Sequence, residues 1–277
     1  MDQDRQRLHQ VLSRFDALLV AFSGGVDSTC LVAEARHVLG RDRVVALLGQ
    51  SPTLPRAEYD DAIALAEKID VPLVIRETGE MNNSRFAQNG PDRCFHCKTS
   101  LFILCKQVVS EQKQPQRWAI AYGANQDDLG DDRPGMIAAR QQGIHAPLLD
   151  AQLGKVAIRR LSRLRGLPTA DKAAFACLSS RIPYHTPITL ENLKRVEQAE
   201  MVLRQAGFHQ FRVRDHGVKA RIELDTEGLA RVGAESVLRA TLCDAVRRCG
   251  YAEVIIDPNG YQMGGANATR SDTVVQP

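Results

Sequence analysis

The chain has 277 residues, 44% of them hydrophobic and 25% charged, which is enough for one large globular domain or two modest ones. Its formal net charge of +3 is too small to indicate a nucleic-acid partner, because a dedicated binder concentrates basic residues. Residues 1–10 contain no apolar segment typical of a signal peptide, and the longest apolar run, 17–22, is too short to cross a membrane, so we expect a cytoplasmic protein without a membrane partner.

The first half of the chain alternates between strand and helix patterns. This rhythm predicts an α/β fold in which a parallel sheet carries helices on both faces, with ligands at the carboxyl ends of the strands. The domain is expected to span 1–165. The predicted strands cover 17–22, 43–48, 72–75 and 118–122, and the clearest helices run to about residue 39 and over 56–69.

The second half begins with an irregular, proline-containing stretch, 166–187, which we interpret as an active-site linker carrying Cys177. A smaller α+β domain is expected over 188–263, with Thr189 as a helix N-cap and Gly207 as the stop signal. Residues 264–277 form a polar tail that we expect to be disordered. The predicted elements of this domain are a helix over 189–205, strands over 211–214 and 218–224 around a turn at 215–217, a helix over 235–248 and a strand over 253–256.

A glycine-containing loop follows the first predicted strand and opens a helix. Glycine allows a tight bend and a close backbone approach to a ligand, and the helix start directs N–H groups toward an anion. Asp27 is suited to bind Mg²⁺, which prefers oxygen ligands. The alternative is a simple turn between strand and helix. The loop reads Ser23-Gly24-Gly25-Val26-Asp27-Ser28.

A second polar segment, 123–128, follows the fourth predicted strand. Gly123 lies at the strand end, and either Asp127 or Asp128 is positioned to bind Mg²⁺ or orient a substrate. An acidic loop exposed to solvent is the alternative interpretation of this segment.

The seven cysteines are odd in number and scattered, which favours metal ligands or core residues over a disulfide framework. Cys94 and Cys97 form a C-x₂-C pair in a predicted loop, and Cys177 is a third candidate ligand. Three thiolates suit a [4Fe-4S] cluster, whereas addition of His96 would give a Cys₃His zinc site. The remaining cysteines lie in helical patterns and are expected in the core: Cys30, Cys105, Cys243 and Cys249.

The strands at 211–214 and 218–224 alternate apolar and charged residues. A period of two places the charged side chains on one face of the sheet. Arg212 and Arg214 on that face are suited to bind a phosphate in a bidentate manner. A solvated face with ordinary cross-strand ion pairs explains the same pattern.

These motifs together resemble a known family. The loop at 23–28 is similar to the PP-loop of ATP pyrophosphatases, and it lacks the Gly-Lys-Ser/Thr of a Walker A loop. Over nearly the whole chain, to about residue 260, the sequence resembles LarE-type sulfur transferases of nickel-pincer nucleotide biosynthesis. The motifs that carry this resemblance are Ser51-Pro52, Arg93-Cys94-Phe95-His96-Cys97-Lys98, Asp127-Asp128-Leu129-Gly130-Asp131, Arg133-Pro134-Gly135, 176–184 and 212–217.

The resemblance implies that ATP adenylates a carboxylate of pyridinium-3,5-biscarboxylic acid mononucleotide, which sulfur then converts to a thiocarboxylate. It assigns nucleotide binding to residues 23–28, Ser51 and Gly123. The implied catalytic residues are Asp27, Asp128, Cys177, Ser180 and Arg181, and the implied substrate-binding residues are Arg212, Arg214, Glu200 and Glu223. Ala170 departs from the family pattern, in which we expect tryptophan.

The family has two variants, which differ in the source of sulfur. In one, a single cysteine at the position of Cys177 gives up its own sulfur and becomes dehydroalanine. In the other, three cysteines hold a [4Fe-4S] cluster, and the presence of Cys94, Cys97 and Cys177 favours this variant.

The implied cofactors are ATP, Mg²⁺ and the cluster, with an unknown sulfur donor, and we also expect a homo-oligomer. Three alternative functions are a cluster-dependent tRNA thiolase, an amide-forming synthetase that uses free ammonia, and a non-catalytic, zinc-stabilised nucleotide-binding protein.

Overall fold

The structure, a computed structural model, describes residues 2–130, 134–173 and 176–261. Asp131 and Arg133 of the resemblance motifs, and the tail expected at 264–277, lie outside these residues. The chain forms two compact units, which we call the first unit (residues 1–86 and 92–175) and the second unit (residues 87–91 and 176–277). The segment 166–187 is thus divided between them.

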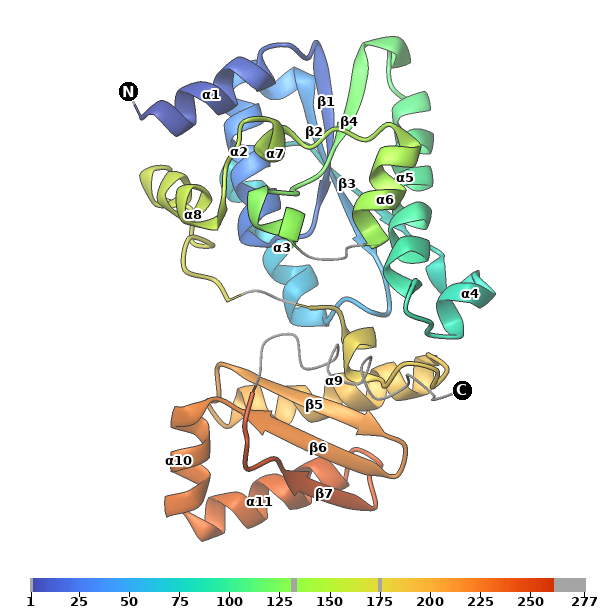
Figure 1. The fold of residues 1–277 in the computed structure, drawn as a ribbon, viewed down its shortest axis with the longest axis vertical. Coiled ribbons are helices and arrows are strands. Elements are labelled where there is room, and N and C mark those ends of the chain that lie inside the picture. The colour runs from blue at the N-terminus through green and yellow to red at the C-terminus, as the bar shows by residue number, and fades with distance from the viewer. Residues whose placement is uncertain (1, 131–133, 174–175, 262–277) are drawn as a thin grey trace, which may run out of the picture. The chain divides into compact units, whose positions relative to one another are not determined.

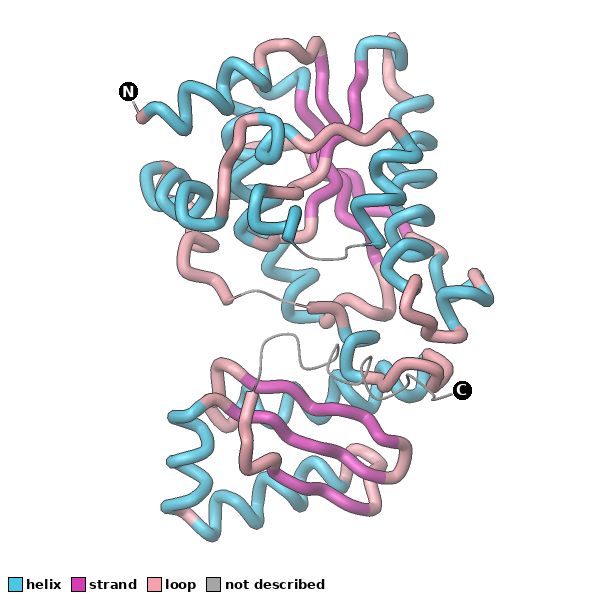
Figure 2. Tube along the Cα trace, viewed as in Figure 1, coloured by secondary structure: helices cyan, strands magenta, loops and turns pink. Residues whose placement is uncertain are grey.

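The first unit is built on a four-stranded parallel sheet with the strand order β3-β2-β1-β4 (Figures 1 and 2). In the register, Leu18 of β1 lies opposite Val44 of β2 and Ala119 of β4. Because all four strands are parallel, the loops that follow them emerge at one edge of the sheet. The strands are β1 (Ala17–Phe22), β2 (Val44–Gln50), β3 (Leu73–Glu77) and β4 (Trp118–Ala121).

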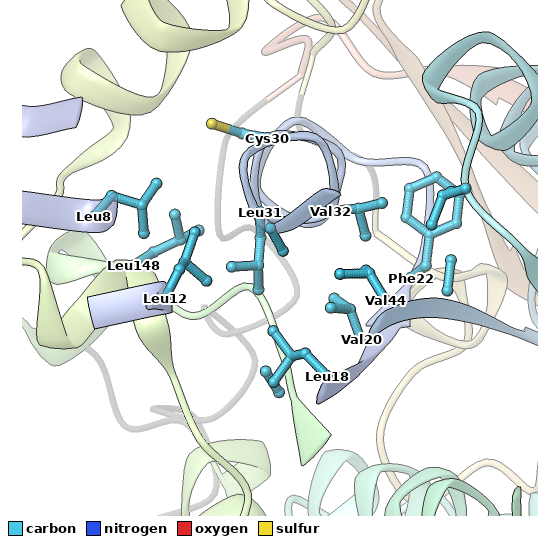
Figure 3. Packing of buried hydrophobic residues seen from close by; sticks show 14 of the residues in the cluster. Leu8, Leu12, Leu18, Val20, Phe22, Cys30, Leu31, Val32, Val44 and Leu148 are labelled. Atoms are coloured by element: carbon cyan, nitrogen blue, oxygen red, sulfur yellow. The ribbon is translucent and has the colours of Figure 1, made fainter. Parts of the chain in front are cut away.

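Helices cover both faces of this sheet (Figure 1). Every residue of β1 is buried, and alternate residues enter two separate cores. Leu18, Val20 and Phe22 share a core with residues of α1, α2 and α7 (Figure 3) and of α3 and α8. Leu19 and Ala21 pack with α5 and α6. The α-helices are α1 (Gln3–Leu12), α2 (Val26–Leu39), α3 (Arg56–Ile69), α4 (Ser84–Ala87), α5 (Arg93–Ser110), α6 (Pro134–Gln142), α7 (Pro147–Asp150) and α8 (Lys155–Leu164).

The predicted fold class and the four predicted strands of this half are confirmed. The predicted loop around the C-x₂-C pair, in contrast, is wrong: both cysteines belong to α5, one in its first turn and the other in its second. The helix packs on the sheet through residues that recur every three positions, the buried Phe102, Cys105 and Val108.

The second unit has a three-stranded sheet with the order β5-β6-β7, antiparallel between β5 and β6 and parallel between β6 and β7. One face packs on the helices to form a separate core that includes Leu203, Val213, Ile222 and Val246. The elements are α9 (Leu190–Gln205), β5 (Phe211–His216), β6 (Lys219–Leu224), α10 (Thr226–Ala234), α11 (Ser236–Arg247) and β7 (Glu253–Ile256).

Local signals of this unit are largely as predicted. Thr189 caps α9 with a full capping box, and Gly207 follows the helix with φ = +82°. The predicted turn at 215–217 is displaced, because β5 continues to His216 and the chain reverses at Gly217 and Val218. Asp215 accepts a hydrogen bond of 2.8 Å from the Gly217 amide, which fixes that reversal. Within the described residues, no helix is long and apolar enough to cross a membrane.

Candidate active site

The loop between β1 and α2 is closely packed, with Ser23 exposed and Ser28 buried. Gly24 adopts φ = +69°, and a Cβ at this position would lie 2.9 Å from the Cβ of Ala62 on α3. The Ser23 and Ser28 hydroxyl oxygens lie 3.2 Å apart, and Ser28 donates to the Gly25 carbonyl at 3.2 Å. No side chain caps the first N–H groups of α2. The loop therefore presents backbone and hydroxyl donors in the arrangement that binds phosphate.

Asp27, in the first turn of α2, is paired with a lysine from a distant part of the chain. The Lys155 ammonium donates to both carboxylate oxygens, at 2.7 and 2.5 Å, and the Asn125 amide lies 3.4 Å from one of them. Both charged side chains are partly exposed, at 33% for Lys155 and 24% for Asp27. The site thus combines a carboxylate suited to Mg²⁺ with a cation suited to phosphate.

The two aspartates after β4 have different surroundings. Asp127 accepts a 2.7 Å hydrogen bond from the backbone amide of Lys155 and so caps α8. Asp128 accepts a hydrogen bond of 3.0 Å from the backbone amide of Asn125, which closes the loop. Gly123 is required for close packing, because a Cβ there would lie 2.9 Å from the amide nitrogen of Ser28. The loop after β4 is thereby held directly against the loop after β1.

Ser51, expected to bind nucleotide, follows β2 at the same edge of the sheet. Its hydroxyl oxygen accepts from the Thr53 amide at 2.9 Å and its proton is donated to the carboxylate of Glu80, a residue that is 1% exposed. The side chain is therefore engaged within the protein.

Cys94 and Cys97 lie one turn apart on α5, so both thiols project from one side of the helix. Cys94 is exposed and Cys97 half-buried. His96 is buried and bound to Asp92 at 2.9 Å, an arrangement that does not favour it as a fourth ligand. Burial raises the pKa of the Cys30 and Cys105 thiols to about 12, in keeping with their predicted role as core residues.

Cys177 belongs to the second unit and is half-buried. Its carbonyl oxygen accepts hydrogen bonds from the Ser180 hydroxyl at 2.8 Å and from the Arg181 guanidinium at 3.0 Å. Arg181 is 1% exposed, and it also pairs with Glu200 at 2.8 and 3.0 Å. Ser180 and Arg181 therefore fix the backbone that carries the Cys177 thiol.

Arg212 and Arg214 of β5 share one face with Glu223 of β6, as predicted. Arg214 donates to Glu223 through two nitrogens at 2.9–3.0 Å and to the Ser180 carbonyl at 2.9 Å. Arg212 stacks over the Tyr261 ring at 5.0 Å. Burial, and then the nearby Arg181 charge, lower the pKa of Arg212. Arg181 and Arg214, each paired with a carboxylate, also donate to the carbonyls of Cys177 and Ser180 and so hold the backbone of this segment.

Sequence reasoning missed three residues of this arrangement: Lys155, Glu80 and Asn89. Asn89 is fully buried at φ = +58°, and its amide donates to the carbonyls of Ile182, Pro183 and Thr186 at 3.3, 2.8 and 2.9 Å. It anchors the segment before α5 to the segment after Cys177, both within the second unit. Asn is a residue type that tolerates a positive φ and favours turns, so the sequence could have indicated a turn here, but nothing local reveals the distant carbonyls that Asn89 binds.

Among the residues that the structure describes, no group of three or more His, Cys, Asp or Glu side chains is arranged to hold a metal ion. Cys94 and Cys97 are in the first unit and Cys177 is in the second. In chemistry, the pair Cys94 and Cys97 offers two thiols one helical turn apart, and cysteine is the residue type that binds iron–sulfur clusters.

Comparison with known proteins gives several matches. Residues 5–93 match the NAD synthase family. The chain is 38% identical over 272 residues to an uncharacterized protein of Synechocystis, covering 96% of this chain and 98% of that protein. It is 32% identical over 258 residues to pyridinium-3,5-bisthiocarboxylic acid mononucleotide synthase of Lactiplantibacillus plantarum, covering 93% and 91%. An uncharacterized protein of Methanocaldococcus jannaschii is 26% identical over 211 residues, covering 76% and 78%.

Proposed function

Because this chain belongs to the LarE-type family of PP-loop sulfur transferases, which use ATP, we propose that it makes a thiocarboxylate on a pyridinium mononucleotide. A carboxylate oxygen of pyridinium-3,5-biscarboxylic acid mononucleotide attacks the α-phosphorus of ATP, and pyrophosphate leaves. A sulfur nucleophile then attacks the acyl carbon, the bond from that carbon to the AMP oxygen breaks, and AMP departs. The product carries sulfur in place of one carboxylate oxygen.

The observation that carries the nucleotide half of this proposal is the pairing of Lys155 with Asp27 beside the phosphate-binding loop. Asp27 would bind the Mg²⁺ that accompanies ATP, and Asp128 lies on the loop after β4 that packs against the loop after β1. Lys155 would then pair with the phosphates. Asp27, in the first turn of α2 after β1, contacts Lys155 and also Asn125, on the loop after β4, at this edge of the sheet. We therefore place the triphosphate on the β4 side of β1 and the nucleoside on the β2 side.

The second unit supplies the substrate site in this proposal. Arg212 and Arg214 would bind the phosphate of the mononucleotide, since guanidinium groups pair with phosphate through parallel hydrogen bonds. Glu223 holds Arg214 in position, and Glu200 holds Arg181. The lowered pKa of Arg212, caused by burial and by Arg181, indicates a site in which an anion would be stabilised.

We propose that Cys94, Cys97 and Cys177 hold a [4Fe-4S] cluster, which when bound would supply sulfur chemistry. The protein's own contribution is to orient the thiols: α5 aligns Cys94 with Cys97, and Arg181 fixes the backbone of Cys177. Asn89, within the second unit, further fixes the segment that follows Cys177. The expected homo-oligomer stays a prediction, which sedimentation analysis tests.

One experiment tests the reaction directly. Anaerobically purified protein is incubated with Mg²⁺, ATP, sulfide and the biscarboxylate mononucleotide, and AMP, pyrophosphate and the nucleotide product are quantified. We expect AMP and pyrophosphate in equal amounts and a product whose mass reflects exchange of oxygen for sulfur. ATP binding without AMP formation, together with one bound zinc per chain, would instead support the non-catalytic zinc protein.

A further inference from the structure

Glu80 is a buried carboxylate at the edge of the sheet where we place ATP. It begins a short 3₁₀ segment, Glu80–Asn82, just after β3, and only 1% of it is exposed. Its two oxygens accept hydrogen bonds from the hydroxyls of Ser51 and Thr78. Within residues 2–130, 134–173 and 176–261, no Lys, Arg or His is paired with it. A buried carboxylate is costly without such donors, so its position calls for a specific role.

The hydrogen bonds around Ser51 use the whole capacity of its hydroxyl group. A serine hydroxyl has one proton and two lone pairs. The proton goes to Glu80, and the oxygen accepts from the Thr53 amide at 2.9 Å and lies 2.7 Å from the Thr53 hydroxyl. The Ser51 side chain therefore has no group left to donate to a nucleotide. The turn after β2 can still contact a ligand through its backbone, and the Ser51 hydroxyl fixes the conformation of that backbone.

Thr78 is held as firmly as Ser51. Its amide donates to the Gln50 carbonyl at 3.1 Å. Its methyl group occupies the space beside Gly49, where an added Cβ would lie 2.5 Å away. Glu80 thus joins the ends of β2 and β3 through two hydroxyls in fixed positions.

The turn at 51–55 contains no basic residue, in contrast to the side of the site that carries Lys155. Neighbouring strands lie about 4.8 Å apart, so this turn lies one strand away from the phosphate-binding loop. A neutral turn that offers backbone groups suits a nucleoside rather than a triphosphate.

We propose that Glu80 is a positioning residue for the nucleoside end of ATP, acting through Ser51 and Thr78 on the turn after β2. The inference rests on the proposed use of ATP, and it assigns Ser51 an internal role instead of direct contact with the nucleotide. Loss of the carboxylate loosens the turn but leaves the phosphate-binding loop intact.

The test compares ATP with inorganic tripolyphosphate, which lacks the nucleoside. Dissociation constants of both are measured by calorimetry for the wild type, Glu80→Gln, Ser51→Ala and the double variant. We expect each single variant to weaken ATP binding by about tenfold, because a hydrogen bond to a charged group is lost. Tripolyphosphate binding should change less than twofold. The double variant should bind ATP no more weakly than Glu80→Gln alone, since both substitutions break the same interaction.

Several results decide the question. Weaker binding with Ser51→Ala but not with Glu80→Gln would show that Ser51 contacts ATP directly and would overturn the inference. An equal loss for ATP and tripolyphosphate would overturn it too, since the role would then be one of general stability.

If Glu80→Gln does not fold, Thr78→Val removes one donor at constant volume and should show the same selective loss. Asp60→Asn, on the exposed side of α3, is the matched control. Failure of the wild type to bind either ligand would count against the proposed function instead.

Discussion

The ammonium group of Lys155 lies 2.5 and 2.7 Å from the two carboxylate oxygens of Asp27 and joins the first residue of α8 to the phosphate-binding loop. If Lys155 stabilises the charge that develops on the phosphates, Lys155→Ala should slow pyrophosphate release by about 100-fold, the usual effect of removing one such group. Asp27→Ala should abolish release, because it removes the proposed Mg²⁺ ligand. Both effects are measured by a coupled pyrophosphate assay.

The matched control is Arg160→Ala on the same helix, where the side chain pairs with Asp2 and Asp4 at the surface. It should leave the rate unchanged, because exposed ion pairs contribute little. Circular dichroism verifies that all three variants fold. Ordinary turnover by a folded Asp27→Ala protein would remove this loop from the active site.

The contrast between Asp27 and Lys155 shows what the sequence could predict. Asp27 was found because an apolar run, two glycines and a helix pattern occur within a few residues of one another. Lys155 is 128 residues away, and only the packing of α8 on α2 brings it to the loop. Tertiary contacts of that range leave no periodic trace in the sequence.

The C-x₂-C pair illustrates a different difficulty. Its spacing is typical of metal-binding loops, yet two residues three positions apart also lie on one side of a helix, and buried Phe102, Cys105 and Val108 show the helical period on another side of α5. In the second unit the alternation of β5 correctly put Arg212 and Arg214 on one face. It could not indicate that Arg214 is bound by Glu223, which lies diagonally across the strand pair.

Arg212 and Arg214 should respond differently to substitution. Arg212→Ala is expected to weaken binding of the mononucleotide substrate by roughly tenfold or more, with ATP binding unchanged, since it removes a phosphate ligand. Arg214→Ala should also lower the free energy of unfolding by about 2 kcal/mol, because buried Glu223 loses its two-nitrogen partner and keeps only the more exposed Arg221. Calorimetry and urea unfolding separate the two effects. Unchanged substrate affinity in both variants would make this face structural.

Stability at low pH should depend on Glu34, a fully buried residue of α2. Burial alone would raise its pKa, but hydrogen bonds from Arg165 and His9 lower it from 4.5 to about 2. Since the pKa is lower in the folded state, the stabilisation is complete above pH 4.5 and is lost as the pH falls toward 2.

Urea unfolding at neutral pH and at pH 3 measures this dependence. Glu34→Gln should lower the free energy of unfolding by about 3 kcal/mol at neutral pH and reduce its change on acidification. Asp70→Asn is the control, because Asp70 pairs with Arg36 and Arg41 while 62% of its side chain is exposed. Equal acid sensitivity of the wild type and Glu34→Gln would assign the effect to other carboxylates.

The last prediction concerns the sulfur source. If Cys94, Cys97 and Cys177 jointly hold one cluster, replacing any of them by alanine should remove bound iron and sulfide, because a cluster held by two thiolates is poorly anchored. All three variants should lose sulfur transfer and keep ATP binding. Cys243→Ala is the matched control, since Cys243 is also half-buried but packs against the core of the second unit.

The alternative, in which Cys177 gives up its own sulfur, leads to opposite results. Cys94→Ala and Cys97→Ala would then support a single turnover, and the thiol of Cys177 would be eliminated with its sulfur passed to the product. The wild-type chain would lose about 34 Da, the mass of H₂S, since the reactive form of cysteine is the thiolate and its loss leaves dehydroalanine. Loss of iron in all three variants with an unchanged wild-type mass supports the cluster. A single turnover in the Cys94 and Cys97 variants, accompanied by the mass loss at Cys177, would establish the sacrificial route.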